Sequence, residues 1–265
     1  MSKLLSLIII TSILFSCKDD EKEVYTRSAK DHSLAEVITM KAFKEVLTIT
    51  PTFIIDKKYA VDTNIIITAK PLLSDSIFPK EITIDYGMGI TGPDGKTRQG
   101  KIKVTINSGT VLTENLQIVF EEYVSEGTEV YGAINFDYSN DNSTISYAVS
   151  IAESGLTFKS ANGTMKWFGD FNIHKADGGN TPNINDDIFK LSGTTNGVDI
   201  SVTSYTVSTQ TDHTIDFNCK SIITAGTSKI TPNGKDEHTV DYGNGDCNAN
   251  AIISLSTGNS QNFNF

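Results

Sequence analysis

The three cysteines are the residues whose surroundings define their chemistry most clearly. Cys17 follows a lysine at position 3, an apolar run over residues 4–15 and a small serine. This order is that of a bacterial lipoprotein signal. The run is shorter than the roughly 20 apolar residues that a membrane-spanning helix needs. We therefore predict that residues 1–16 are a cleaved signal peptide and that Cys17 carries a diacylglycerol thioether and an acylated amine. An ordinary secretory signal that contains a cysteine is the alternative.

The residues that follow Cys17 are charged. Lys18, Asp19 and Asp20 resemble the lipoprotein export signal of Bacteroidota, and this resemblance implies display on the outer face of the cell. A solvated charged tether is the alternative. Several acyl chains anchor a protein durably, because each buried methylene contributes about 0.8 kcal/mol. We expect a protein that is lipid-anchored in the outer membrane and exposed at the cell surface, with residues 17–32 as a flexible polar tether.

Cys219 and Cys247 are the two cysteines left after the signal is removed. Outside the cytosol a lone pair of cysteines favours a disulfide bond. Two free thiols or a metal pair are the alternatives, but no histidine lies at ligand spacing from either cysteine. The sequence therefore predicts a bridge between these two residues.

Candidate metal ligands and catalytic groups are sparse. Asp241, Asn244 and Asp246 form a weak calcium candidate, because hard cations prefer oxygen ligands. The same residue types are the usual residues of turns, and the twelve-residue calcium pattern is absent. We expect a turn and no cofactor. No Gly-x-Ser-x-Gly elbow occurs. A serine triad assembled from distant segments stays open, since its members need not be close in sequence.

Charge and aromatic residues narrow the classes of partner. The chain has 22 basic and 32 acidic residues, with a net charge of −10. Arginine occurs only at positions 27 and 98, so a nucleic-acid partner is not expected. Trp167, with Tyr147, Phe168 and Phe171, is a candidate platform for sugar stacking, although alternating aromatic residues on a strand are more often core.

One short segment carries a modification signal. The tripeptide at residues 75–77 resembles the O-glycosylation sequence of Bacteroidota, with Ser76 as the acceptor. Such three-residue patterns also occur by chance.

The elements that position these residues are one helix and many strands. Ser33 and Glu36 form a capping-box pattern ahead of an apolar stripe, and together they predict a helix over residues 33–50. From Phe53 the apolar period is two, with turn clusters between the runs. We predict a mainly β fold, either an antiparallel β-sandwich or a long curved meander, with one N-terminal helix.

The motif Asp-Tyr-Gly-x-Gly occurs at residues 85–89 and again at residues 241–245. Its glycines permit positive φ, and its aspartate can cap its own turn. The repeat suggests two related halves. We place the first β region at residues 53–155 and the second, which contains the disulfide, at residues 156–265.

Several segments resemble a recurrent group of lipoproteins from Bacteroidota whose function is not known. They are residues 82–87 with 91–101 (ITIDYG, TGPDGKTRQGK), 162–167 (NGTMKW), 185–194 (NDDIF, then LSGT) and 230–247 (ITPNGK through DYGNGDC). The similarity covers most of residues 75–256. It implies a fold and a location but transfers no active site. Members often carry a further cysteine at the position of Ile90, so any N-terminal bridge of the group is missing here.

We accordingly expect a non-enzymatic interaction or envelope module, held at the membrane by its N-terminal lipid. The alternatives are a glycan-binding or glycan-hydrolysing lipoprotein and a fimbrial-type subunit. The first requires a platform or paired carboxylates, which are about 5 Å apart in retaining hydrolases and about 6.5 to 9.5 Å apart in inverting ones. The second requires an open groove that accepts a strand from another copy.

Overall fold

The computed structural model describes residues 25–56, 65–72, 76–92, 95–107, 115–141, 144–179, 181 and 183–265, and the side chains of residues 49–56 lie outside this description. The elements are α1 (Arg27–Asp56), β1 (Ile66–Lys70), β2 (Lys80–Asp85), β3 (Ile90–Thr91), β4 (Thr97–Ile106), β5 (Leu116–Ser125), β6 (Thr128–Asp141), β7 (Thr144–Ser160), β8 (Gly163–Asp177), the 3₁₀ turn η1 (Ile184–Asp186), β9 (Ile188–Val198), β10 (Ser204–Asp216), β11 (Ile223–Pro232), β12 (His238–Asn244), β13 (Asn250–Leu255) and β14 (Ser260–Asn264).

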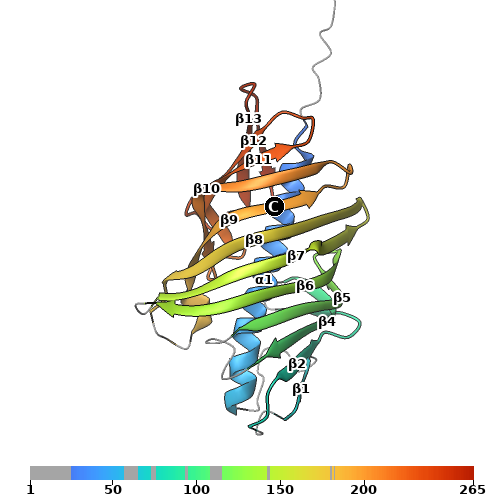
Figure 1. Ribbon diagram of the computed structural model, residues 1–265, viewed down its shortest axis with the longest axis vertical. Helices are drawn as coiled ribbons and strands as arrows, with labels where there is room; N and C mark the ends of the chain where they lie inside the picture. The colour runs from blue at the N-terminus through green and yellow to red at the C-terminus, as the bar shows by residue number, and fades with distance from the viewer. Residues whose placement is uncertain are drawn as a thin grey trace, which may run out of the picture.

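The strands form one antiparallel sheet in which almost every strand pairs with its neighbours in sequence. The order runs from β1 and β2 through β4 to β14, and the short β3 pairs with β4. This architecture confirms the predicted mainly β, antiparallel fold with one helix, in the form of a long curved meander. Figure 1 shows the strands crossing α1 one after another along the long axis of the molecule.

The helix lies inside the curve of the sheet. None of residues 25–48 is exposed, as expected for a helix that is covered on all sides. Phe43 marks the centre of the core: its ring stacks on that of Phe136 at 4.6 Å, and the edges of Tyr147 and Phe189 lie 5.5 and 6.1 Å away. The predicted apolar stripe of the helix is therefore core, but so are its other faces.

The predicted bounds of the helix and of the tether were wrong. The helix begins at Arg27, inside the segment that we assigned to the tether, and runs through Pro51 to Asp56. The polar residues of its first turns find partners that the local sequence does not reveal. Arg27 Nε lies 2.9 Å from Asp31 Oδ1, and Asp31 accepts a hydrogen bond from the Ile200 amide at 2.8 Å. Ser33 is thus an interior residue of the helix rather than its cap.

The predicted boundary between two β regions falls inside a continuous strand. Strand β7 runs from Thr144 to Ser160, and the sheet continues without a break on both sides of it. Long strands bend here because extra residues enter the ladder. The register of β7 and β8 shifts between Ile151 and Leu156, beside Gly155 at φ 76°, and such bulges curve a strand. The sheet is therefore one curved body rather than two regions.

The two Asp-Tyr-Gly-x-Gly segments share one local hydrogen bond, although the first connects β2 to β3 and the second is the end of β12. In each, the first glycine amide donates a hydrogen bond of 2.8 Å to the aspartate, Gly87 to Asp85 and Gly243 to Asp241. Both glycines have positive φ, 56° and 91°, which costs glycine little. The predicted self-capping of these turns is confirmed.

Candidate functional site

The repeated turns each direct a buried tyrosine onto the helix. The hydroxyl of Tyr242 lies 2.8 Å from Ser33 Oγ, and the hydroxyl of Tyr86 donates to Glu45 Oε2 at 2.9 Å. The two helix positions are twelve residues apart, which is about 18 Å along a helix. The motif therefore attaches α1 to the sheet at two separated points.

Between these two points lies a buried polar cluster. Glu36 and His32 come from α1, His213 from β10 and Ser228 from β11. Glu36 Oε1 lies 2.6 Å from His213 Nδ1, and its Oε2 lies 3.1 Å from His32 Nε2. His213 Nε2 is 2.8 Å from Ser228 Oγ. Because each imidazole contacts a different oxygen of Glu36, the groups form a linear relay rather than a convergent ligand set.

The pKa of Glu36 identifies the donors and acceptors in this relay. Burial alone raises this pKa, but the neighbouring His213 and His32 outweigh burial and lower it from 4.5 to about 2. An ionised carboxylate only accepts hydrogen bonds. His213 Nδ1 must therefore donate to Glu36, while its Nε2 is left to the Ser228 hydroxyl.

This connectivity is that of a Ser-His-acid triad, which the sequence left open. However, Ser228 and His213 are both 0% exposed, and the acidic member, Glu36, belongs to the helix that covers them. Moving α1 aside to admit a substrate would remove Glu36 from the relay. In this fold the three residues hold the helix to the sheet, and the serine has no route to a substrate.

Trp167 lies beside this cluster, in the interior. It is 1% exposed, its ring centroid is 5.6 Å from that of Phe171 and 6.1 Å from that of His32, and Tyr147 is buried as well. The core interpretation is confirmed for Trp167, Tyr147 and Phe171, and Phe168 is partly buried against the core, so these four residues do not form an exposed sugar-stacking platform. The inner face of the sheet is likewise not the open groove that a fimbrial subunit requires, since α1 fills it.

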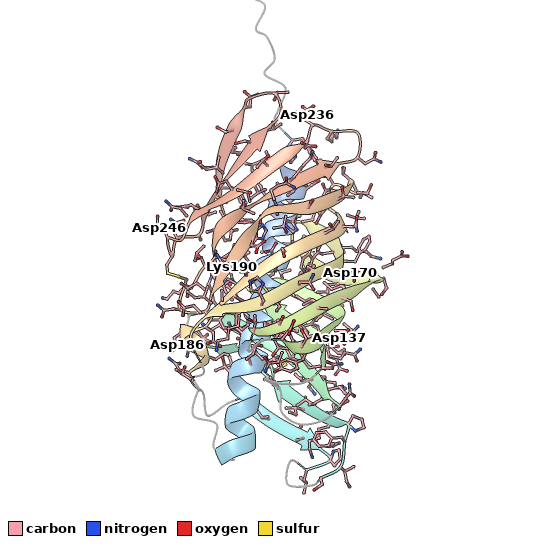
Figure 2. The ribbon with its side chains drawn as sticks, turned by 60° about the vertical axis from the view of Figure 1, so that its left-hand side comes forward. Asp137, Asp170, Asp186, Lys190, Asp236 and Asp246 are labelled. Carbon is pink, nitrogen blue, oxygen red and sulfur yellow. A yellow bond between two sulfur atoms is a disulfide. The ribbon has the colours of Figure 1, made fainter. Side chains whose placement is uncertain are left out.

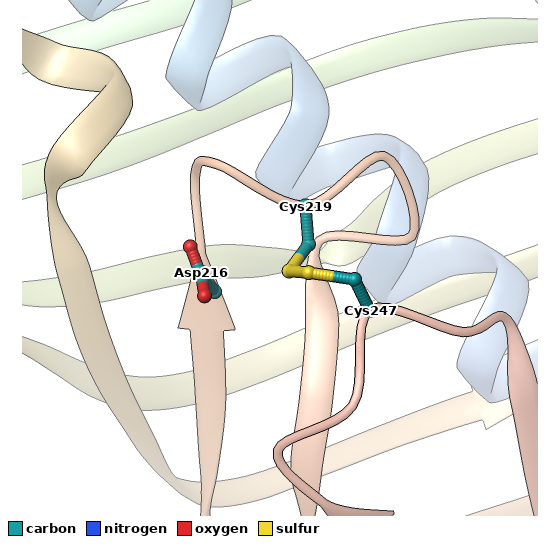
Figure 3. A group of neighbouring side chains, drawn as sticks. All are labelled: Asp216, Cys219 and Cys247. Carbon is teal, nitrogen blue, oxygen red and sulfur yellow. A yellow bond between two sulfur atoms is a disulfide. The ribbon is translucent and has the colours of Figure 1, made fainter.

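The predicted disulfide between Cys219 and Cys247 is present, with the Cα atoms 5.1 Å apart. Among the described residues, one group of three possible metal ligands lies close together, Asp216 with these two cysteines. Figure 3 shows the two sulfur atoms joined to each other beside Asp216. Thiols in a disulfide do not serve as thiolate ligands, so this group is not a metal site.

The weak calcium candidates lie at the end of β12 and in the loop that follows it. The carboxylate of Asp241 accepts the Gly243 amide, and Asn244 and Asp246 are exposed. Neither aspartate belongs to a close group of acidic, histidine or cysteine ligands within the described ranges. Figure 2 shows Asp246 in the loop that carries the disulfide.

Exposed apolar side chains are concentrated at the β1 end of the described structure. Of the six large apolar residues that are exposed among those described, four lie there: Ile66 (62% exposed), Leu72 (66%), Ile77 (62%) and Met88 (95%). Beside them the outer face has a shallow groove of about 280 Å³, lined by Ile66, Thr68, Lys70, Glu81, Thr83, Asp85, Lys101, Lys103 and Glu121. Its charges are partly paired, Lys103 with Glu121 at 2.7 Å and Lys101 with Asp85 at 3.3 Å.

The remaining predicted sites lie outside the described residues or directly beside a gap in them. Cys17, Lys18, Asp19 and Asp20 lie outside the described residues. Ser76 is exposed near β1, and its glycosylation stays a prediction. Within the described chain no helix combines the length and apolar character needed to cross a bilayer.

Comparison with protein-family models, with curated proteins and with solved structures finds no match to this chain. The function of the chain must therefore be inferred from its own residues and their geometry. Sequence reasoning missed the relay, because it assigned Glu36 to a helix cap and treated the histidines as unrelated. One signal was available: His213 alternates with the apolar Ile215 on β10 and so faces inward.

Proposed function

We propose that this protein is a non-enzymatic, lipid-anchored module of the outer-membrane surface that presents an interaction site at the end farthest from its anchor. The observation that supports this proposal is the separation of two features along one rigid body. The helix begins at one end of the sheet, and the exposed apolar side chains gather at the other.

The start of the helix is fixed against the last strands. Thr26 Oγ1 donates to Gln261 Oε1 of β14 at 3.2 Å, and the ring of Tyr25 lies 6.1 Å from that of His238 on β12. Tyr25 is eight positions after Cys17, and this length of chain can span at most about 29 Å. An acylated Cys17 therefore keeps the β12–β14 end beside the membrane.

The far end follows from the length of the helix. The 30 residues of α1 correspond to about 45 Å. At the middle of the helix Lys41 pairs with Glu126, between β5 and β6, at 2.6 Å, and further along Glu45 accepts from Tyr86, which follows β2. Figure 1 shows β1 and β2 beside the last part of α1. The exposed apolar residues of the β1 end thus point away from the membrane, and exposed apolar clusters mark binding surfaces.

Two experiments test the proposal. In the first, Cys17→Ala should release the protein from the membrane fraction, and retention after a high-salt wash would refute the lipid anchor. Asp19→Ala with Asp20→Ala should keep the protein inside the cell, measured by its resistance to protease added to whole cells. Asp236→Ala with Asp246→Ala is the matched control, because it removes two exposed charges elsewhere and should leave export unchanged.

The second experiment measures orientation by energy transfer to an acceptor dye in the bilayer. Dyes are attached at Asp236→Cys, in the loop where Lys235 lies over the Tyr25 ring at 5.4 Å, or at Met88→Cys. Figure 2 shows Asp236 at the end where α1 begins. We expect strong transfer from position 236 and weak transfer from position 88. Equal or reversed transfer would contradict the proposed orientation.

A further inference from the structure

Strand β1 forms one of the two ends of the sheet. Strand β1 pairs with β2 in the register Ile66 with Asp85 through Lys70 with Glu81, and no other described strand pairs with it. Within the described part of the chain, the backbone donors and acceptors of its second edge therefore have no ladder partner. Such an edge is a template for an added strand.

The core is also incomplete at this strand. On β2 the inward residues Ile82 and Ile84 are fully buried, whereas Ile67 and Ala69 on β1 pack against the core but stay partly exposed. One more strand beside β1, with apolar residues facing inward, would cover them. Ile66 is exposed on the outer face of the same edge.

The other end of the sheet does not have this character. On β14 the one large apolar residue, Phe263, is buried, and its ring lies 5.9 Å from that of Phe265. Gln261 of the same strand contacts the start of the helix. The two terminal strands are of equal length. Of the two, only β1 has exposed large apolar side chains at its unpaired edge.

We propose that β1 is a docking strand, which binds an extended segment of a partner protein by antiparallel β-strand addition. This inference rests on the proposed function for the direction of approach. The open edge faces away from β2 and hence away from the anchored end (Figure 1). Pairing of two copies through β1 would place their anchors at opposite ends, so two molecules in one membrane cannot pair this way, and the occupant is a different chain.

The chain itself shows which segment suits β1. Strand β2 places Glu81 opposite Lys70, Ile82 and Ile84 opposite the inward residues Ala69 and Ile67, and Thr83 opposite Thr68. Cross-strand pairs of this kind supply the specificity of a sheet. The segment that binds β1 therefore has an acidic residue followed by alternating apolar and polar residues.

The probe is a synthetic peptide with the sequence of residues 80–86, Lys-Glu-Ile-Thr-Ile-Asp-Tyr. Its binding to the purified full-length chain is measured by fluorescence anisotropy, with a scrambled peptide and a peptide carrying proline in place of threonine as controls. We expect saturable binding of the first peptide and at least tenfold weaker binding of both controls. Equal binding of the proline peptide would overturn the proposal, because proline cannot join the ladder.

A charge exchange locates the site. Lys70→Glu places like charges opposite each other and should weaken binding of the peptide about fivefold. A second peptide with lysine in place of its glutamate should bind this variant within about twofold of the original pair. Asn262→Glu on β14 is the matched control and should change nothing. Loss of binding in both variants, or no rescue by the second peptide, would refute docking at β1.

Two further outcomes are distinguishable. A dimer of the full-length chain in analytical ultracentrifugation that Lys70→Glu dissociates would overturn the proposal in favour of self-pairing. Peptide binding is measured in solution and does not depend on the anchor. It would therefore survive a failure of the Cys17→Ala experiment, which tests the proposed function alone.

Discussion

The two Asp-Tyr-Gly-x-Gly turns are alike in backbone and different in what their tyrosines contact. Tyr242 meets the neutral Ser33 hydroxyl. Tyr86 meets Glu45, which also pairs with Arg98 and lies 3.3 Å from the Tyr123 hydroxyl. Burial raises the pKa of both turn tyrosines well above 10, and Glu45 adds to the effect at Tyr86. The motif thus encodes the turn and the direction of the ring, while the helix decides the chemistry of the contact.

The segments that follow the two turns also differ. The second turn continues into Cys247, whose disulfide ties its loop to the segment after β10. The first turn continues into Ile90, which is buried and makes no such link. One end of the sheet has a disulfide between two of its loops, and the other has a terminal strand with exposed apolar residues.

The largest effect is expected where α1 meets the sheet beside Tyr242. Glu36→Ala leaves His213 and His32 buried without their carboxylate, and removing one partner of a buried pair costs about 3 to 5 kcal/mol. The free energy of unfolding in urea measures this loss. Glu129→Ala removes a partly exposed carboxylate that pairs with Lys159 at 3.9 Å and accepts from the Tyr131 hydroxyl; because these partners remain in contact with solvent, it should cost no more than about 1 kcal/mol. A loss of similar size in both variants would contradict a special role for Glu36.

The second prediction concerns removal of the disulfide. Cys219→Ser with Cys247→Ser should lower stability by about 2 to 5 kcal/mol without changing the fold, because the bridge closes a long loop in the unfolded chain. Circular dichroism and urea unfolding of the double variant measure these two properties. Free alkylatable thiols at both positions in the unreduced protein would refute the bridge before any stability is measured.

The third prediction is loss of stability in acid. The folded pKa of Glu36, about 2, is below its ordinary 4.5, so its contribution is present above pH 4.5 and is lost as pH falls through 2. Burial lowers the pKa of His238 below 6.5, and the neutral ring therefore stabilises the fold above pH 6.5 and less below it. Stability should decline from about pH 6.5 downward, with about 3 kcal/mol attributable to Glu36.

A series of unfolding curves between pH 7 and 2 checks this decline. The Glu36→Gln variant should show a shallower slope below pH 4.5, since it lacks the titrating group. An equal slope in the variant and the parent protein would contradict the assignment to Glu36.

The sequence predicted what depends on neighbours along the chain and missed what depends on distant residues. Alternation identified the strands, and Asp241, two positions before Gly243, predicted its own turn. The disulfide followed from the compartment and the count of cysteines. The start of the helix did not follow, because the partner of Asp31 is the Ile200 amide. The relay did not follow either, since Glu36 and His213 are 177 positions apart and their contact exists only once the sheet has curved round α1.

The two tyrosines give the fourth prediction. Tyr86→Phe removes a hydrogen bond to a carboxylate and should cost about 1.5 to 3 kcal/mol, whereas Tyr242→Phe removes one to a hydroxyl and should cost about 0.5 to 1.5 kcal/mol. Tyr205→Phe is the control, because its buried hydroxyl has no hydrogen-bond partner within the described part of the chain. That change should be neutral or stabilising. A larger loss for Tyr242→Phe than for Tyr86→Phe would reverse the contrast between the two ends.

The smallest effect is expected when the two turns are made identical. Met88 and Asn244 occupy the same position of the motif, so Met88→Asn gives the first turn the sequence of the second. Met88 is 95% exposed, and a side chain that is already in water loses almost no packing when it is replaced. We expect a change in the free energy of unfolding within about 0.5 kcal/mol, and the same for Asn244→Met. A loss of more than about 1 kcal/mol for Met88→Asn alone would show that this methionine is covered in solution. The β1 end would then be closed like the other, and its apolar residues would be core rather than a surface for a partner.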